Sequence, residues 1–529
     1  GLGLGHTRLA ILELSDAANQ PAGEGAGELC YNGEIYNFAE LALQLDDSRL
    51  SGAGDTRVLL AALRARGMRS LRDLDGMFAF AFHDRTEDVL HLVRDPVGQK
   101  PLYYAYFDGD LWFASEAQVL RQLPGIGDTL NGAVMSAWLA IGATELASGA
   151  TLYEGIYSLP PGHRLEVPRH SLQAWPRPKP SRWSTLRTGT TDETQARKAI
   201  QDSIGKRLVA DVPLGALLSG GVDSALLISL IAEKRPLAGL QTFGVGYTDD
   251  DADLRWARRV ARDLGVEHHE VLLDRDQYLT LHDEATLALG APLTFGNEPA
   301  LLALCRKARE HVTVVLGGEG ADEAFAGYRQ PFASPTWRRR AVGFAAGLLG
   351  QREKEALAAT FGMLPPLGES DFFLNMYHWF SFAERGFLYG DDFKEVAGHD
   401  DELFAHIDAL YKVAPTHCNL ARQQGVFIGD HLPRLLRRLD AMSMACGLEA
   451  RAPFCARSVI TAGLSLPASA KLTPHFGQDL SLAQSLTAVG GKDILRRFAR
   501  DRDLCVATRP KNPFGAPFLA WFTEDYADH

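Results

Sequence analysis

The sequence of 529 residues has little of what defines several common protein classes. Its six cysteines are scattered without CxxC spacing, so neither a disulfide framework nor a zinc site is indicated. The longest apolar run near the middle, residues 341–350, is far too short to span a bilayer. The chain opens without the charged-then-apolar segment of a signal peptide. A reduced, cytoplasmic setting is therefore expected.

Positive charge is also in deficit, since 54 Lys and Arg residues face 66 Asp and Glu residues, for a net charge of −12. Such a chain repels nucleic acid and anionic membrane surfaces, so neither is expected as a partner. A small anion such as ATP is still permitted, because one local electropositive loop can hold it. The length predicts two domains, and 46% hydrophobic with 23% charged residues is typical of a globular protein.

Residues 1–170 show short apolar, β-branched or aromatic runs separated by turn residues, which predicts a mainly β domain. The expected strands are 8–12, 27–31, 77–83, 89–93, 102–106 and 111–114, and the expected helices are 36–45 and 56–66. Residues 171–191 are rich in Pro, Arg, Ser, Trp and Thr, and this composition predicts a linker.

In residues 192–529 strands alternate with longer helices, which predicts βαβ units and a parallel sheet. The expected helices are 192–208, 224–234, 252–264 and 298–310, and the expected strands are 214–218, 240–246, 268–272 and 312–316. From residue 331 onward the pattern is mostly helical.

The clearest functional signal is an apolar strand that ends in Ser-Gly-Gly-Val-Asp-Ser, residues 219–224, and passes directly into a helix. Paired glycines let backbone amides approach phosphate oxygens, and the helix N-terminus adds partial positive charge. Ser219 and Ser224 can donate hydroxyls, and Asp223 offers a carboxylate for a magnesium bridge. The loop lacks the Lys of a Walker motif, so it is not the P-loop of a kinase or GTPase. It resembles the loop that binds the pyrophosphate part of ATP in enzymes that adenylate a carboxyl or carbonyl oxygen.

Further segments resemble motifs of glutamine-hydrolysing asparagine synthetases, in the same order and spacing along essentially the whole chain. They are Leu-Gly-Gly-Glu-Gly-Ala-Asp-Glu-Ala-Phe-Ala-Gly-Tyr (316–328), Asp-Ala-Met-Ser-Met-Ala-Cys-Gly-Leu-Glu-Ala-Arg-Ala-Pro-Phe (440–454), Gly-Lys-Asp-Ile-Leu-Arg (491–496) and Arg-Pro-Lys-Asn-Pro-Phe-Gly (509–515). In the first domain, Tyr-Asn-Gly-Glu-Ile-Tyr-Asn (31–37) is similar to the glutaminase signature of that family.

The resemblance implies an α+β glutaminase of the Ntn-hydrolase type, an αββα sandwich, over residues 1–170. It implies that residues 192–529 form an α/β ATP-pyrophosphatase (PP-loop) synthetase domain, adenine-nucleotide α-hydrolase-like, with a helical C-terminal part. The implied substrates are glutamine, aspartate and ATP with Mg²⁺. ATP would adenylate the aspartate side chain and ammonia from glutamine would attack it, giving asparagine, AMP and pyrophosphate. A homodimer is compatible with the resemblance.

In the synthetase domain the resemblance assigns Asp223 and Asp322 to Mg²⁺ and Lys492 to the phosphates. It places Glu319 near the reacting carboxyl, as a candidate general base. The residues expected to contact ATP are Leu217, Ser219, Gly220, Gly221, Val222, Asp223, Ser224, Val245, Gly246, Gly317, Gly318 and Lys492.

In the first domain the resemblance implies an N-terminal Cys nucleophile whose own α-amine is the base. Arg8 is assigned to the glutamine α-carboxylate, a bidentate task suited to guanidinium. Asp55, with Glu34, is assigned to the α-amino group. The Asn32 side chain and the Gly33 amide are assigned to the oxyanion hole.

The sequence departs from the family pattern at the nucleophile, because no Cys precedes Cys30, which falls in a predicted strand. Truncation and a lineage without glutamine hydrolysis are the two explanations. Retention of the glutamine-contact residues, with a first residue other than Met, favours truncation.

Two departures concern the acceptor: Gly317 replaces a Ser, and Asn297-Glu298-Pro299 replaces an Asp/Pro/Ser segment. They leave open a ligase or cyclase for another carboxyl acceptor. A silent sensor that binds nucleotide or glutamine is the alternative of another class.

Other conspicuous residues are given ordinary structural interpretations. The His268-His269-Glu270 segment is expected in a strand rather than on a metal. The basic segment 337–340 is expected to be a solvated helix face. Whether Arg437 and Arg438 face the nucleotide is left open.

Overall fold

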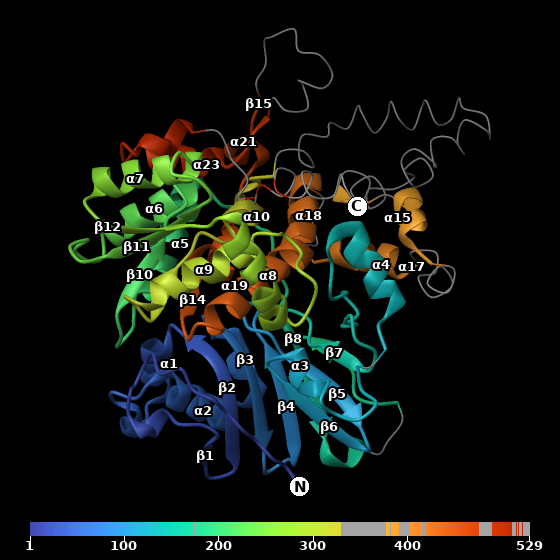
Figure 1. Ribbon diagram of the computed structural model, residues 1–529. Coiled ribbons are helices and arrows are strands. Elements are labelled where there is room, and N and C mark those ends of the chain that lie inside the picture. The colour runs from blue at the N-terminus through green and yellow to red at the C-terminus, as the bar shows by residue number, and fades with distance from the viewer. Residues whose placement is uncertain are drawn as a thin grey trace.

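The computed structural model describes residues 1–127, 129–172, 176–328, 377–380, 382–390, 401–413, 416, 418–474, 489–509, 515, 517 and 521 (Figure 1). The apolar run 341–350, the basic segment 337–340 and residues 510–514 of the last motif lie outside this part of the chain. Among the described residues, no helix combines the length and the apolar composition needed to cross a bilayer.

Two antiparallel sheets form the first half of the molecule, in the lower part of Figure 1. The larger sheet has the order β1-β2-β3-β4-β8-β9 and the smaller one the order β6-β5-β7. Their strands are β1 (Ala22–Glu24), β2 (Gly27–Ile35), β3 (Gly76–Asp84), β4 (Val89–Arg94), β5 (Tyr103–Phe107), β6 (Asp110–Ala114), β7 (Ile156–Ser158), β8 (His163–Pro168) and β9 (Ser181–Arg182).

Helices cover both outer faces of this pair of sheets. Because side chains alternate along a strand, Leu29, Tyr31 and Ile35 of β2 face α1 (Phe38–Leu45) and α2 (Asp55–Arg66) and form one core with them. Residues of β3, β4, β5 and β8 fill a second core between the sheets. Helix α3 (Ala117–Leu120) packs against β5 and β6 on the outer face of the smaller sheet. The layers are therefore helix, sheet, sheet, helix.

The strand predicted at residues 8–12 is wrong, because residues 1–11 adopt no regular secondary structure. The alternation that suggested a strand is real: Ile11 is buried in the core of the second half, and Leu9 packs against the same core. The Ile11 carbonyl accepts a hydrogen bond from the Asp211 amide, at 3.0 Å. Residues 8–12 are therefore extended along the second half of the molecule. Their side chains are alternately buried there although no strand pairs with them.

The second half is built on a parallel sheet of five strands in the order β12-β11-β10-β13-β14. These are β10 (Leu214–Leu217), β11 (Gln241–Gly246), β12 (Glu267–Leu272), β13 (Val314–Leu316) and β14 (Glu449–Arg451). In register, Leu214 of β10 lies beside Val314 of β13. The chain enters at β10, adds two strands on one side and then returns to add two on the other.

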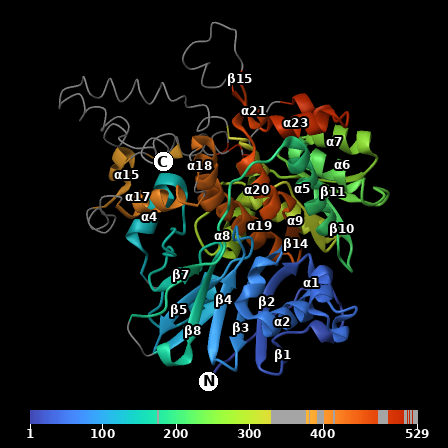
Figure 2. The ribbon, with the colours of Figure 1, turned by 180° about the vertical axis from the view of Figure 1, so that it is seen from behind.

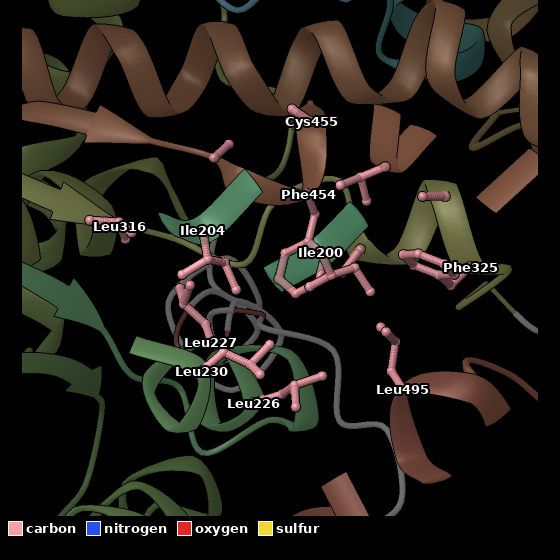
Figure 3. Close-up of a cluster of buried hydrophobic side chains, with 14 of the residues drawn as sticks. Ile200, Ile204, Leu226, Leu227, Leu230, Leu316, Phe325, Phe454, Cys455 and Leu495 are labelled. Carbon is pink, nitrogen blue, oxygen red and sulfur yellow. The ribbon is translucent and has the colours of Figure 1, made fainter. Parts of the chain in front are cut away.

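Helices cover both faces of the parallel sheet (Figures 1 and 2). On one face lie α5 (Glu193–Lys206), α6 (Val222–Ile231), α7 (Ala252–Leu264), α10 (Ala321–Phe325), α20 (Arg457–Ser465) and α23 (Asp493–Arg500). On the other lie α8 (Arg275–Leu289), α9 (Glu298–Arg309) and α19 (Leu432–Met444). Figure 3 shows the first of these cores, where Ile200 of α5 and Leu226 of α6 lie near Phe454.

The remaining described elements are mostly helical and lie beside the second half. They are α15 (Phe382–Leu388), α17 (Asp401–Leu410), α18 (Asn419–Val426), a π-helical turn (Phe427–His431), α21 (Ala468–Lys471) and a short pairing of β15 (Thr473–Pro474) with β16 (Val489–Gly490). Helix α4 (Gly132–Ile141) comes from the first part of the sequence but packs against α15 and α17.

This topology fixes where a ligand can bind. The strand order reverses between β10 and β13, so the loops that follow these two adjacent strands lie next to each other at the carboxyl ends of the strands. In open α/β sheets, ligands bind in the crevice that such a reversal opens at the carboxyl ends of the strands. The two loops are residues 218–221 and 317–320, which contain the predicted phosphate loop and the start of the acidic motif.

Candidate active sites

A cavity of about 420 Å³ opens at this reversal point. Of the residues predicted to contact ATP, those in its wall are Leu217, Ser219, Gly221, Val222, Asp223, Ser224, Val245, Gly318 and Lys492, together with Glu319 and Asp322. The other predicted contacts, Gly220, Gly246 and Gly317, lie behind this wall.

The phosphate loop is held from behind by close packing and by one arginine. Gly220 has φ +65°, and a Cβ there would lie 2.6 Å from the backbone nitrogen of Ala257, so the position requires glycine. The Arg509 guanidinium donates hydrogen bonds to the carbonyls of Gly220 (2.5 Å) and Ser219 (3.4 Å). Arg509 also pairs with Asp253 of α7. Arg509 therefore binds the loop through its carbonyl oxygens.

Lys492 lies between two carboxylates that come from the first turns of two helices, α6 and α10. Its ammonium pairs with Asp223, and with Asp322 Oδ1 at 2.8 Å. Burial alone would lower the pKa of Lys492, but the two carboxylates raise it, so the side chain is a cation. A Cβ at Gly327 would lie 1.8 Å from Asp322 Oδ1 and 2.4 Å from Lys492 Cε, so only glycine leaves room for this cluster.

The donor set of Asp223 and Asp322 fits Mg²⁺. This hard cation prefers oxygen ligands and commonly takes only one or two protein carboxylates beside phosphate oxygens and water. The described residues contain no group of three or more His, Cys, Asp and Glu side chains arranged for a metal ion. A metal held jointly by two carboxylates and a nucleotide needs no such group.

Glu319 folds back over the glycine that departs from the family pattern. A Cβ at Gly317 would lie 2.2 Å from Glu319 Oε2, so the missing side chain leaves the space that the carboxylate fills. Oε2 is buried and has no hydrogen-bond partner among the described residues. Burial raises the pKa of Glu319, and the Arg438 guanidinium partly opposes this effect.

The end of the cavity beyond Glu319 contains residues that the sequence patterns did not identify. Arg438 of α19 donates a hydrogen bond to Asn297 Oδ1 at 2.6 Å, and its guanidinium lies 5.1 Å from the centre of the Phe295 ring. Tyr328 and His431 line the same end. Arg438 thus faces this cavity, whereas Arg437 faces the second one. No sequence signal separated these two arginines.

The second cavity, of about 640 Å³, lies between the two halves of the molecule. All five residues predicted to contact glutamine line it: Arg8, Asn32, Gly33, Glu34 and Asp55. Gly33 has φ +138°, and a Cβ there would lie 2.0 Å from the Met77 carbonyl oxygen, so glycine is required. Asn32 and Glu34 alternate with the residues that face α1 and α2, and therefore point away from those helices.

The carboxylate of Asp55 is fixed by three donors. Its Oδ2 accepts hydrogen bonds from Tyr31 Oη (2.8 Å) and the Ile35 amide (3.0 Å), and its Oδ1 accepts one from the Thr56 amide (2.8 Å). Burial raises the pKa of Asp55, and these hydrogen bonds oppose the shift.

Arg8 is bound to its own loop in this structure. Its guanidinium donates to the carbonyls of Leu12 (3.0 Å), Glu13 and Ser15 (2.9 Å). It also donates to Asn19 Oδ1, at 3.2 Å. A carboxylate that binds Arg8 would therefore share or replace these carbonyls.

Cys30 lines the same cavity from within β2, and its Sγ lies 3.4 Å from the Gly5 carbonyl oxygen. Burial raises the pKa of the Cys30 thiol, which disfavours the thiolate needed for nucleophilic attack.

His268, His269 and Glu270 lie in β12, away from both cavities, and the ring of His269 stacks on His311 at 4.0 Å.

Comparison with known proteins links both cavities to described families. The family described as "Asparagine synthase" matches residues 195–529, and the "Glutamine amidotransferase domain" matches residues 1–177. "Asparagine synthetase [glutamine-hydrolyzing] 3" of Bacillus subtilis is 26% identical over 93% of this chain and 78% of its own length. A "Putative asparagine synthetase [glutamine-hydrolyzing]" of Mycobacterium tuberculosis is 30% identical over 98% of this chain and 80% of its own. "Amidase chry2" of Gibberella zeae is 26% identical over 89% and 75% of the two chains.

Proposed function

This chain belongs to the asparagine synthase family of glutamine-hydrolysing carbon–nitrogen ligases, and we propose that it forms a carboxamide on aspartate from ATP and glutamine. The first half, as an Ntn-hydrolase-type glutaminase of about residues 1–170, releases ammonia. The second half, as a PP-loop synthetase of residues 192–529, adenylates the side-chain carboxylate of aspartate. Ammonia then attacks the acyl carbon, and asparagine and AMP leave after pyrophosphate.

The observation that carries the proposal is the meeting of three separate motifs in one cavity. The amides of the phosphate loop and the hydroxyls of Ser219 and Ser224 can hold the pyrophosphate end of ATP. Lys492, already a cation between Asp223 and Asp322, can turn to the departing pyrophosphate as charge grows there. Mg²⁺ held by the two carboxylates would neutralise phosphate charge. Asp223 and Asp322 would then still be paired with Mg²⁺ when the Lys492 ammonium turns toward the pyrophosphate.

Glu319 is proposed as the base for the second step. Its side chain lies in the cavity wall, together with the phosphate loop and with Arg438. A carboxylate with a raised pKa takes a proton from an attacking ammonium more readily than an ordinary one. Arg438 prevents the burial of Glu319 from neutralising it fully.

In the glutamine cavity, Asp55 and Glu34 are proposed to bind the α-ammonium and Arg8 the α-carboxylate. The Asn32 side chain and the Gly33 amide would stabilise the oxyanion. The nucleophile in this proposal is an N-terminal Cys of the native chain. A cytoplasmic setting is part of the proposal and agrees with six unpaired cysteines.

The test follows nitrogen from donor to product. The full-length native protein is incubated with amide-labelled glutamine, aspartate and ATP, and labelled asparagine, AMP and pyrophosphate are measured together. Labelled asparagine in step with pyrophosphate supports the proposal. Pyrophosphate without labelled asparagine refutes aspartate as acceptor, and no pyrophosphate refutes the ligase.

A second candidate is an amide-forming ligase or cyclase with another carboxyl acceptor. It is favoured by the departures at Gly317 and Asn297 from the expected Ser and Asp/Pro/Ser residues. Asn297 lines the cavity together with Phe295 and Arg438, and Gly317 lies under Glu319. Pyrophosphate release screened over a panel of carboxylic acids, with ammonia supplied, distinguishes this candidate from aspartate amidation.

A further inference from the structure

Arg451 of the synthetase half lies beside Glu34, a residue that lines the glutamine cavity. Residues 440–454 resemble a synthetase motif, yet Asp440 and Glu449 both line the cavity between the halves. Asp440 Oδ1 lies 2.7 Å from Lys100 Nζ of the first half, and both side chains are largely buried. Figures 1 and 2 show β14 at the boundary between the halves, next to α1 and β2.

Arg451, at the end of β14, is fully buried and pinned at several atoms. Its Nε donates to Glu449 Oε1 at 2.7 Å, and its Nη1 donates to the carbonyls of Arg207 (2.8 Å) and Val209 (2.7 Å). These bonds fix the plane of the guanidinium. The remaining nitrogen, Nη2, lies 3.9 Å from Glu34 Oε1 in the first half.

The contact between Arg451 and Glu34 is too long for a hydrogen bond. Arg451 Nη2 and Glu34 Oε2 are both buried, and neither has a hydrogen-bond partner among the described residues. Burying an ionised carboxylate without hydrogen bonds is strongly unfavourable, so the position demands a further ligand or a nearby cation. The α-ammonium of glutamine, a donor with positive charge, supplies what Glu34 lacks.

The other charged and titratable groups that face Glu34 are two carboxylates, two cations and two phenols. They are Asp55 of α2, Glu449 and Arg451 of β14, Lys100 of the loop before β5, and the phenols of Tyr31 and Tyr36. Burial and the carboxylates of Asp55 and Glu449 raise the pKa of Glu34, while Arg451 and Lys100 oppose this effect. Without Arg451, protonation of Glu34 would be favoured still more.

We propose that Arg451 is a positioning residue of the glutamine site, supplied by the synthetase half, whose guanidinium favours the carboxylate form of Glu34 when the α-ammonium of glutamine binds there. The proposal rests on the glutaminase function proposed above. It follows that the first half does not form a complete glutamine site by itself, because β14 belongs to the parallel sheet of the other half.

The test compares Arg451→Met and Arg451→Lys with the native full-length protein. Glutamine hydrolysis is measured between about pH 6 and pH 8, where the α-ammonium stays charged, and glutamine binding is followed by calorimetry. Arg451→Met should raise KM for glutamine about tenfold with little change in kcat, because it removes a cation that favours the carboxylate form of Glu34 which binds the ammonium. Arg451→Lys keeps the charge and should recover part of the loss.

The pH dependence gives a readout that a loss of packing would not produce. Glu34 binds the α-ammonium only when ionised, so KM rises as the pH falls through its pKa. In Arg451→Met that pKa is higher, and the rise in KM should therefore begin at a higher pH. If Arg451→Met does not fold, the KM and pH profile of Arg451→Lys test the proposal instead. A lysine cannot bind Glu449 and both carbonyls at once, so a smaller change in KM is still expected.

Two controls separate the proposal from general damage. Arg207→Met removes another fully buried arginine that crosses the same boundary, but its guanidinium binds Ser203 Oγ (2.8 Å) and Asp75 (3.4 Å), which lie outside the glutamine cavity. Glu34→Gln combined with Arg451→Met should have nearly the KM of Glu34→Gln alone, because Arg451 acts through that carboxylate.

Distinct outcomes overturn the two proposals. A native protein that neither binds nor hydrolyses glutamine contradicts the glutaminase function. A native protein that does, with Arg451 variants whose KM and pH profile match those of Arg207→Met, contradicts the role of Arg451.

Discussion

Replacing Gly317 by alanine tests whether the geometry of Glu319 sets the rate of amide formation. The added Cβ would lie 2.2 Å from Glu319 Oε2, about 0.8 Å short of the 3.0 Å below which such contacts are essentially never seen. Gly317 is not in the left-handed region, so alanine introduces no backbone strain. The flexible carboxylate must therefore move into the cavity by about that distance.

Two effects of this movement can be predicted. A displacement near 1 Å of a catalytic group commonly lowers a rate by about a hundredfold. Moving Oε2 out of its buried position also removes part of the burial that raises the pKa of Glu319, and we expect the pKa to fall. Because Glu319 acts as a base only when ionised, a lower pKa moves the acidic limb of the rate profile to lower pH.

The assay is single-turnover amide formation with ammonia in place of glutamine, measured across pH, with KM for ATP determined in parallel. Gly317→Ala should lower the rate between tenfold and a hundredfold and leave KM for ATP within about twofold. Gly317→Ser adds the same Cβ with a hydroxyl that can donate to the displaced carboxylate, so its acidic limb should lie lowest. An unchanged rate and pH profile in Gly317→Ala would refute the role given to Glu319.

Three further predictions concern the two cavities. Lys492→Met should lower ATP-dependent pyrophosphate release about 10²–10³-fold, because it removes the cation that meets the leaving group, and glutamine hydrolysis should be unaffected. Gly33→Ala should destabilise the protein by about 3 kcal/mol or more in thermal or denaturant unfolding, because φ is +138° and the Cβ would overlap the Met77 carbonyl. Arg509→Lys should raise KM for ATP about fivefold in steady-state assays, because lysine cannot bind both loop carbonyls and Asp253.

Each of these changes has a control in the chain. Lys492→Arg keeps the charge and should retain more pyrophosphate release than Lys492→Met. Gly52→Ala changes a glycine with φ +72° that has open space around it. Its loss of stability measures the backbone strain alone, without the steric overlap that Gly33→Ala adds. Arg502→Met breaks an ion pair with Glu233 away from the phosphate loop. If Arg502→Met raises KM for ATP as much as Arg509→Lys does, the loop has no special dependence on Arg509.

The sequence predicted the parallel sheet and its phosphate loop because both depend on local patterns. An apolar strand, paired glycines and a helix start are adjacent in the chain, and the observed β10 and α6 begin within two residues of the predicted positions. Helix α8 was missed although its signals are present. A capping box joins Asp274 and Gln277, and the buried Tyr278, Leu281, Ala285 and Leu289 follow helical spacing.

What sequence patterns could not give are the contacts between distant segments. β14 has three residues, too few for a periodic signal, and it becomes a strand because β13 offers a free edge. Residues 8–12 show the converse, since their alternating burial comes from packing against the second half rather than from a sheet. The phosphate cavity likewise needs Arg509, which lies almost 290 residues beyond the loop that it holds.

Helix α19 explains how the two cavities come to lie back to back. Consecutive residues of a helix diverge by about 100°, so neighbouring arginines can face different sites. Arg437 binds Thr144 at 2.7 Å and Glu145 at 3.3 Å on the glutamine side, whereas Arg438 binds Asn297 at 2.6 Å on the ATP side. The wall between the cavities at this point is therefore about one helix thick, roughly 10 Å with its side chains. One helix therefore contributes an arginine to each cavity, and in the proposed reaction ammonia passes this helix on its way from the glutamine cavity to the ATP cavity.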